Sequence, residues 1–104
     1  MNKMNKMNNV NNEMLYHEVV IVCENNIATE LKNELENAKV ELQEWQEWGM
    51  KKLTFPVKEH TEGYFIYFQL IGNNDLDKVD KVLQPNELIL KYRIITSKIP
   101  FELR

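Results

Sequence analysis

Only one cysteine, Cys23, occurs in the 104 residues. One thiol cannot form an internal disulfide and cannot build a cysteine-based metal site alone, which excludes disulfide-stabilised scaffolds and zinc fingers. Long apolar runs are also missing, because the longest ones, residues 19–23 and 64–68, have the length of strands and not of membrane-spanning helices. No secretory signal peptide is recognisable, so we expect a soluble protein in a reducing compartment.

The motifs of common enzyme classes are absent as well: the sequence has no GxSxG, no P-loop and no GxGxxG. Its two histidines, His17 and His60, fall in different predicted elements, and a lone histidine on a strand is more often structural than catalytic. Glu44 and Glu47 flank Trp45 on a predicted strand, which gives no acid–base pair in a defined cleft. No spacing of His, Cys, Asp or Glu suits a metal. We therefore expect no catalytic residues, no cofactor and no metal site.

A surplus of positive charge is lacking too. The formal net charge is −3 and the sequence pI is about 5.4, whereas a generic nucleic-acid-binding protein usually carries a basic surplus. Any contact with RNA must therefore come from local basic positions or from a partner that supplies positive charge. The hydrophobic fraction of 43% is enough for the core of one small domain.

Residues 1–14 are almost entirely Asn, Met and Lys and have no amphipathic period. We expect this extension to be disordered, because it has almost nothing to bury. Two interpretations stay open: a targeting segment, since Lys3 and Lys6 precede any acid, or an extension from a genome biased towards Asn and Lys codons. The predicted organisation is an Asn-rich extension at 1–14, a folded domain at 15–100 and a short tail at 101–104.

The first half of the folded domain predicts a strand and a helix. The β-branched run at residues 19–22 indicates a buried strand over 15–23. An amphipathic helix follows, with Asn25 or Asn26 suited to its N-cap and its end near Lys39. Its buried face is predicted to consist of Ile27, Leu31, Leu35 and Ala38.

The next segment predicts two strands. Residues 40–57 alternate apolar and polar side chains at both ends, which indicates one long strand with a bulge or kink near Gly49. Pro56 cannot donate to a ladder, so this strand is expected at an edge of the sheet or to end there. Residues 58–63 predict a turn, and the aromatic run at 64–71 predicts the next strand.

A second helix and a last strand complete the domain. Asn74 or Asp75 can cap the helix, and Pro85 ends it. Its buried face is predicted to contain Leu76, Val79 and Leu83, with Val82 beside them. Residues 88–96 form the last strand. The order β-α-β-β-α-β predicts an α+β, ferredoxin-like sandwich: a four-stranded antiparallel sheet with two helices on one face and the other face free for a partner.

Two segments, residues 48–57 and 62–68, combine lysines with aromatic side chains. Physics alone favours a hairpin of core strands with incidental lysines; the alternative is a basic and aromatic strand pair that faces RNA. An RNA-recognition motif shares this order of elements and stacks bases on aromatic side chains of its third strand. Here Glu62 precedes Gly63, and Phe65 stands where that motif has a small residue, so the match is weak.

The same segments resemble a known family. The W-G-x-K-K-L-x-F-P-V of residues 48–57 is similar to the W/L-G-x-R-R-L-A-Y-P-I signature of small-subunit ribosomal protein six. Gly63-Tyr64-Phe65 resembles the G-Y-F with which the third strand of that family begins. Residues 16–19 and 89–92 resemble its Y-E opening and its V-x-R-Y pattern, and the resemblance covers about residues 15–100. Met50 stands where some members have another basic residue, and Thr54 replaces Ala.

The resemblance implies a structural ribosomal protein that binds the central domain of small-subunit rRNA together with small-subunit ribosomal protein eighteen, a small basic protein. Such a partner would supply the positive charge that this acidic chain lacks for binding RNA. The candidate RNA contacts are the basic residues Lys51, Lys52, Lys91, Arg93 and Lys98. The candidate partner interface consists of Trp48, Phe55 and Pro56. Strand alternation predicts that Lys51 and Lys52 face opposite sides and that Lys91 and Arg93 share one side.

Two other functions stay open. One is a stand-alone RNA-recognition-like module that stacks single-stranded RNA on Tyr64 or Tyr67. The other is a ferredoxin-like regulatory or oligomerisation module that touches no nucleic acid. The composition, rich in Asn and Lys and poor in Ala and Arg, favours a mitochondrial ribosome in an AT-rich eukaryote. The cytoplasm of a bacterium with an AT-rich genome is the alternative compartment.

Overall fold

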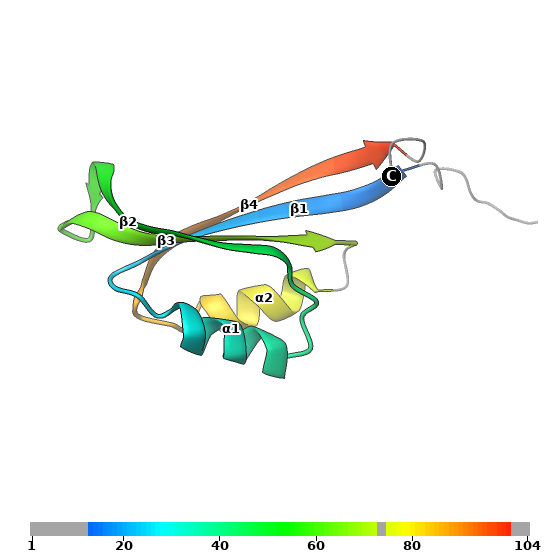
Figure 1. The fold of residues 1–104 in the computed structure, drawn as a ribbon, viewed down its shortest axis with the longest axis horizontal. Coiled ribbons are helices and arrows are strands. Elements are labelled where there is room, and N and C mark those ends of the chain that lie inside the picture. Colours follow the sequence, from blue (N-terminus) through cyan, green and yellow to red (C-terminus); the bar gives the residue numbers. More distant parts are fainter. Residues whose placement is uncertain (1–12, 73–74, 101–104) are drawn as a thin grey trace, which may run out of the picture.

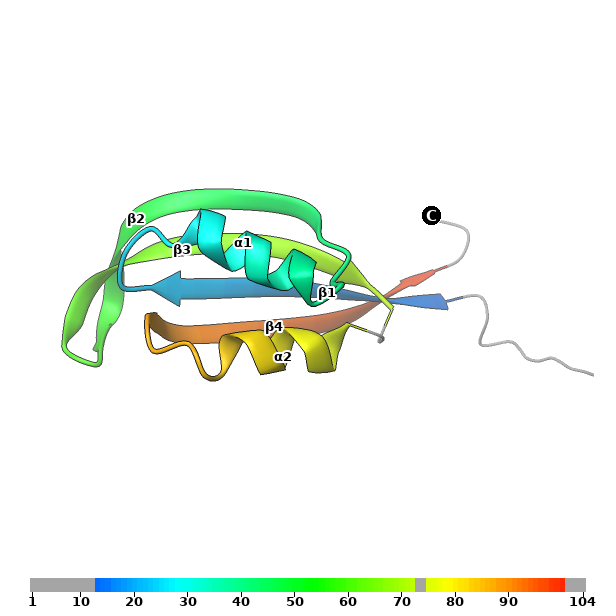
Figure 2. The ribbon, with the colours of Figure 1, turned by 90° about the horizontal axis from the view of Figure 1, so that it is seen from below.

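The chain folds as two layers, a four-stranded sheet and a pair of helices on one of its faces (Figures 1 and 2). A computed structural model describes residues 13–72 and 75–100. Its elements are β1 (Glu13–Cys23), α1 (Ala28–Asn37), β2 (Gln43–Val57), β3 (His60–Ile71), α2 (Leu76–Leu83) and β4 (Ile89–Pro100). The strands are antiparallel and lie in the order β2-β3-β1-β4. The predicted ferredoxin-like α+β fold is confirmed.

The core lies between the sheet and the helices because every second residue of the central strands points towards α1 and α2. In β1 this series is Val19, Ile21 and Cys23, each fully buried. The helices contribute the residues that the helical period predicts, namely Leu31, Leu35, Val79 and Leu83. Central β1 is thus covered on its helix side, as its β-branched run predicts.

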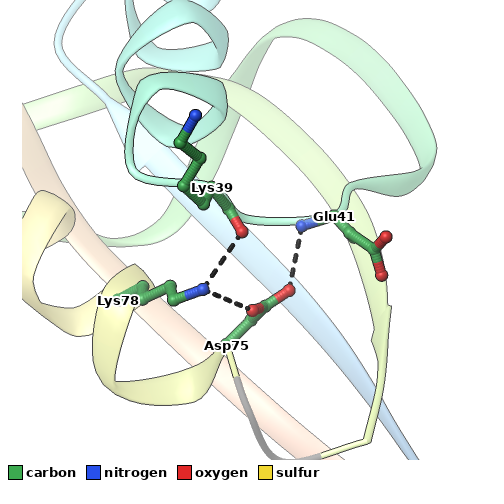
Figure 3. A network of polar contacts seen from close by, with 4 residues as sticks. All are labelled: Lys39, Glu41, Asp75 and Lys78. Carbon is green, nitrogen blue, oxygen red and sulfur yellow. Dashed lines mark hydrogen bonds and ion pairs between the residues drawn. The ribbon is translucent and has the colours of Figure 1, made fainter.

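Polar side chains lie at the start of both helices, but neither N-cap residue forms a side-chain cap hydrogen bond. The N-cap of α1 is Ile27 and not the expected Asn25 or Asn26; the Oδ1 of Asn26, one residue earlier, accepts a hydrogen bond from the backbone N–H of Ala28 at 3.0 Å. Asp75 is the N-cap of α2, one of the two residues predicted for it, but its carboxylate accepts from the backbone N–H of Glu41 at 2.9 Å and from Lys78 at 3.3 Å instead of capping the helix. Lys78 also donates to the carbonyl of Lys39 (Figure 3). This network ties the connection between α1 and β2 to the first turn of α2.

The long strand β2 is irregular at the predicted place. Its register with β3 shifts between Glu47 and Gly49, and Gly49 has a φ of +87°, which suits glycine at a bulge. Further shifts follow Gln43 and Lys52. The strand is an edge of the sheet, as Pro56 requires.

Several predicted boundaries are wrong. The turn between β2 and β3 contains only Lys58 and Glu59, both with positive φ as in a type I′ hairpin, and β3 therefore begins at His60. Residues 40–42 precede β2, because the N–H of Val40 bonds to the carbonyl of Leu35 and closes α1.

The first and last strands of the chain also extend further than predicted. β1 begins two residues earlier than the expected domain start, and β4 runs to Pro100, because Glu13 pairs with Pro100 in the ladder between them. The remaining extension and tail, residues 1–12 and 101–104, and the possible cap Asn74 lie outside the described residues.

Candidate nucleic-acid interface

The sheet face opposite the helices, called the open face below, carries the residues that alternate with the core. Direct partners in an antiparallel ladder share a face, so the pairings run as rows across β3, β1 and β4. One row joins Phe65, Val22 and Lys91. The next joins Tyr67, Val20 and Arg93. Two cations of β4 therefore lie beside an apolar strip on the central strands.

Lys91 and Arg93 border a hollow of about 430 Å³ on the open face. The apolar lining comes from Val20, Val22, Phe65 and Ile95. Ile95 is 43% exposed, although its side chain is large and apolar. The prediction that Lys91 and Arg93 share one side is confirmed by the ladder. The apolar lining was not predicted. Alternation along β4 from Lys91 and Arg93 would have indicated Ile95, whereas Val20, Val22 and Phe65 follow only from the ladder pairings.

The other two predicted lysines separate as alternation requires. Lys51 pairs with Gly63, which shares the face of Phe65, so Lys51 belongs to the open face at its β2 edge. Lys52 pairs with Glu62 and belongs to the opposite side. The structure therefore brings Lys91 and Arg93 together at one edge and leaves Lys51 at the other edge, three strand spacings or at least roughly 14 Å away. The backbone of Lys98 in β4 pairs with that of Leu15 in β1, and the side chain of Lys98 lies outside the described residues.

An aromatic stack covers the open face next to β2. The ring of Trp48 lies on that of Tyr67, with centroids 5.2 Å apart and planes 13° apart. Trp48 is 42% exposed, whereas Tyr67 is only 8% exposed. Tyr64 belongs to the other face, where it packs against the core and its hydroxyl donates to Glu47. Of these rings, Trp48 is the one that the open face presents, and neither tyrosine named for base stacking is well placed for it.

Hydrogen bonds fix the underlying tyrosine. The Tyr67 hydroxyl donates to the Glu18 carboxylate at 2.6 Å and accepts from the side-chain amide of Gln69 at 2.6 Å. The Tyr16 hydroxyl donates to the same carboxylate at 3.2 Å. Hydrogen bonding to Tyr67, together with burial and the Glu18 charge, raises the pKa of Tyr16 above its ordinary value. This part of the open face is therefore polar and aromatic, with the Tyr67 ring held by two hydrogen bonds.

The hairpin of β2 and β3 supplies the other predicted partner residues. Phe55 is 77% exposed, and Pro56 is exposed beside it. Neither has a ladder partner in β3, because the register shifts between Lys52 and Val57. Trp48 lies seven residues from Phe55 along the same strand, a separation of roughly 20 Å. The predicted partner interface is therefore divided between the open face and the hairpin end.

The described residues show little that is suited to catalysis. They contain no group of three or more His, Cys, Asp or Glu that could hold a metal ion. Cys23 is fully buried, and burial raises the pKa of its thiol to about 11, so it stays protonated at neutral pH. His17 is also buried and forms a 2.8 Å hydrogen bond with the Thr96 hydroxyl. Neither described helix has the length and apolarity needed to cross a membrane.

A family model, relatives in sequence and a solved structure all point to the same protein family. The family described as Ribosomal protein S6 matches residues 5–96. The small ribosomal subunit protein bS6 of Blochmanniella floridana is 25% identical over 93 residues, covering 82% of this chain and 78% of the relative. That of Dictyoglomus turgidum is 31% identical over 65 residues, covering 62% and 67%. A crystal structure of 30S ribosomal protein S6 from Thermotoga maritima superposes with a TM-score of 0.62 at 17% identity, covering 82% of this chain and 88% of that one.

Proposed function

Because the chain belongs to the ribosomal protein S6 family, we propose that it binds the central domain of small-subunit rRNA together with small-subunit ribosomal protein eighteen. Membership makes the protein a structural, non-enzymatic constituent of the small ribosomal subunit. The proposal adds the RNA region, the partner and the contacting residues.

The observation that carries the RNA contact is the joint position of Lys91 and Arg93 on the open face. Both are exposed, and neither forms an ion pair with a described carboxylate. Free cations on one rigid strand suit phosphate oxygens spaced along an RNA backbone. Lys51 adds a third cation at the opposite edge of this face. Of the two other candidates, Lys52 belongs to the helix side and is expected to contribute less, and Lys98 lies further along β4.

The net charge of −3 supports a partner-dependent mode of binding. Few phosphate contacts give weak affinity at physiological salt, because each neutralised phosphate contributes only a limited counterion release. A basic partner bound next to the open face would add contacts and hold the RNA across both proteins. The exposed Trp48 on the open face and the uncovered Phe55 and Pro56 of the hairpin are apolar surfaces for that partner.

Filter binding to a central-domain rRNA fragment, with and without protein eighteen, tests the proposal. We expect tight binding only with the partner present. Arg93→Ala should weaken this binding several-fold and reduce the salt slope by about one. Lys81→Ala is the matched control, because it removes one positive charge from exposed α2 on the other layer. Binding that never depends on the partner, or equal losses in both variants, would contradict the proposal.

The compartment is a separate part of the proposal. The composition favours a mitochondrial small subunit, with the bacterial cytoplasm as the alternative, and the relatives described above are bacterial. Co-sedimentation of the tagged protein in cells that make it distinguishes the two. Tagged protein in organellar small subunits would support the mitochondrial assignment, and tagged protein in cytoplasmic bacterial subunits would overturn it.

A further inference from the structure

We propose that a groove on the helix layer, remote from the open face, binds a basic segment of a neighbouring protein through one apolar side chain and flanking cations. The groove has a volume of about 560 Å³ and lies between α1 and the connection from α2 to β4. Figure 2 shows that this connection curls around the end of the layer where α1 begins. The site is independent of the proposed RNA contacts, because the helices cover the other face of the sheet.

The floor of the groove is apolar. Ile27 and Leu31 underlie it from the side of α1 but are themselves buried, so its accessible apolar area comes from the partly exposed Val82 of α2 and from Leu88. Leu88 completes the lining and is 41% exposed, although it stands just before β4. A large exposed aliphatic side chain inside a concavity offers area that an apolar side chain of a partner can cover.

The rim of the groove is acidic. Glu30, Glu34 and Glu87 belong to its lining, which includes no Lys or Arg. The two ion pairs among the described residues, His60 with Glu24 and Lys78 with Asp75, involve none of these three carboxylates. The rim is therefore a set of uncompensated negative charges around an apolar floor.

The sequence of α1 explains why these charges stay uncompensated. Glu30 and Glu34 are four residues apart and so lie next to each other on the helix surface, where like charges repel. The single lysine of α1, Lys32, is turned away, with its Nζ 5.6 Å from the centroid of the Trp45 ring on β2. A bound cation would relieve the repulsion that the helix does not relieve itself.

The negative charge of the rim indicates that the bound segment is positively charged. RNA and acidic peptides are disfavoured at this rim, since each would place negative charge against three carboxylates. A Lys- or Arg-rich segment with one Leu-like side chain satisfies both the rim and the floor. The protein would then use its two layers for different partners, phosphate on the open face and a basic protein segment on the helix face.

Titration with peptide probes tests this groove in the full chain. The probes are nine-residue peptides that alternate Lys with Leu, Glu with Leu, or Lys with Ala. We expect the Lys–Leu peptide to bind and to shift the amide NMR signals of Leu31, Val82 and Leu88, and the other two to bind much more weakly. Glu34→Lys should lower the affinity about tenfold, whereas Glu36→Lys, the same charge change outside the lining, should stay within about twofold.

Several results would contradict the proposed groove. Equal losses in both variants, shifts confined to the open face, or no binding of the Lys–Leu peptide would each overturn the proposal. Both variants should keep the partner-dependent binding to rRNA, so failure of the groove and failure of the rRNA function are separate observations. In assembled subunits, a photo-cross-linker at Leu88 should reach an identified Lys- or Arg-rich protein segment. Cross-links to RNA, to a second copy of this chain, or to nothing would count against it.

Discussion

The two faces of one sheet are built from alternate residues of the same strands and have almost opposite character. On the helix side, Val19 and Phe68 are fully buried in a continuous apolar core. On the open face, the ladder partner of Val20 is Arg93, and Glu18 holds two tyrosine hydroxyls. The period of two in a strand lets one segment supply folding free energy on one side and the proposed recognition surface on the other.

The two faces of the sheet should also differ in how much a substitution destabilises the fold. The helix side is held by close packing, where a lost side chain leaves a cavity. The open face is held by hydrogen bonds and ring stacking on a rigid sheet, so its exposed cations can change without disturbing the fold. Three matched pairs of substitutions test this contrast, each placing the same chemical change on two different environments.

The largest effect is expected for Phe68→Ala. Phe68 is fully buried and its ring stacks on that of Trp45 with centroids 5.5 Å apart, so its removal should lower the free energy of unfolding by about 3–5 kcal/mol. Phe55→Ala makes the same change at a ring that is 77% exposed and should stay within about 0.5 kcal/mol. Denaturant unfolding measures both. A comparable loss in Phe55→Ala would mean that the hairpin is part of the core.

A smaller effect is expected from removing one hydroxyl of the open face. Tyr67→Phe deletes the donor to Glu18 and the acceptor for Gln69, which should cost about 1.5–3 kcal/mol, since one bond is to a carboxylate in a nearly buried place. Tyr64→Phe removes only an exposed bond to Glu47 and should cost less than about 1 kcal/mol.

The pH dependence of the same network has a definite sign. The raised pKa of Tyr16 means that its stabilising effect is fully present below the unfolded-state value of about 10 and is lost as the pH rises further. Tyr67→Phe removes the largest cause of that shift, so the variant should lose less stability than the wild type on raising the pH from 9 to 11. An unchanged alkaline slope would contradict the role of Tyr67.

The parts of the fold that depend on local pattern were predictable. The β-branched run of β1, the apolar face of α1 and the bulge at Gly49 follow from neighbours in the sequence, and the structure has all three. The hairpin turn was missed because Lys58 and Glu59 adopt positive φ without the Gly or Asn that normally marks such a turn. At this turn Val57 pairs with His60, after a register shift that follows Lys52, and a pattern of neighbours in the sequence does not contain that pairing.

For the candidate site, the sequence predicted only which side of the sheet each basic residue faces. Alternation placed Lys91 with Arg93 and separated Lys51 from Lys52, in agreement with the ladders. It could not reveal that Trp48 stacks on Tyr67, because the bulge at Gly49 changes the facing of β2 at that point. The acidic groove was equally hidden, since it joins α1 to a connection more than 50 residues later. Both proposed recognition surfaces are formed by contacts between segments that are distant in the sequence.

The smallest effect, and the sharpest test of the two faces, is expected from neighbouring lysines. Lys51→Ala should weaken the partner-dependent binding to rRNA by about threefold and reduce the salt slope by about one, because Lys51 belongs to the open face. Lys52→Ala, which removes the same charge next to Glu62 on the other side, should change the affinity less than about twofold. Filter binding over a range of salt concentrations measures both. Since the two variants have equal net charge, equal losses would mean that RNA responds to the total charge of the hairpin and not to the face. A larger loss in Lys52→Ala would mean that RNA approaches from the helix side, which would reverse the roles assigned to the two layers.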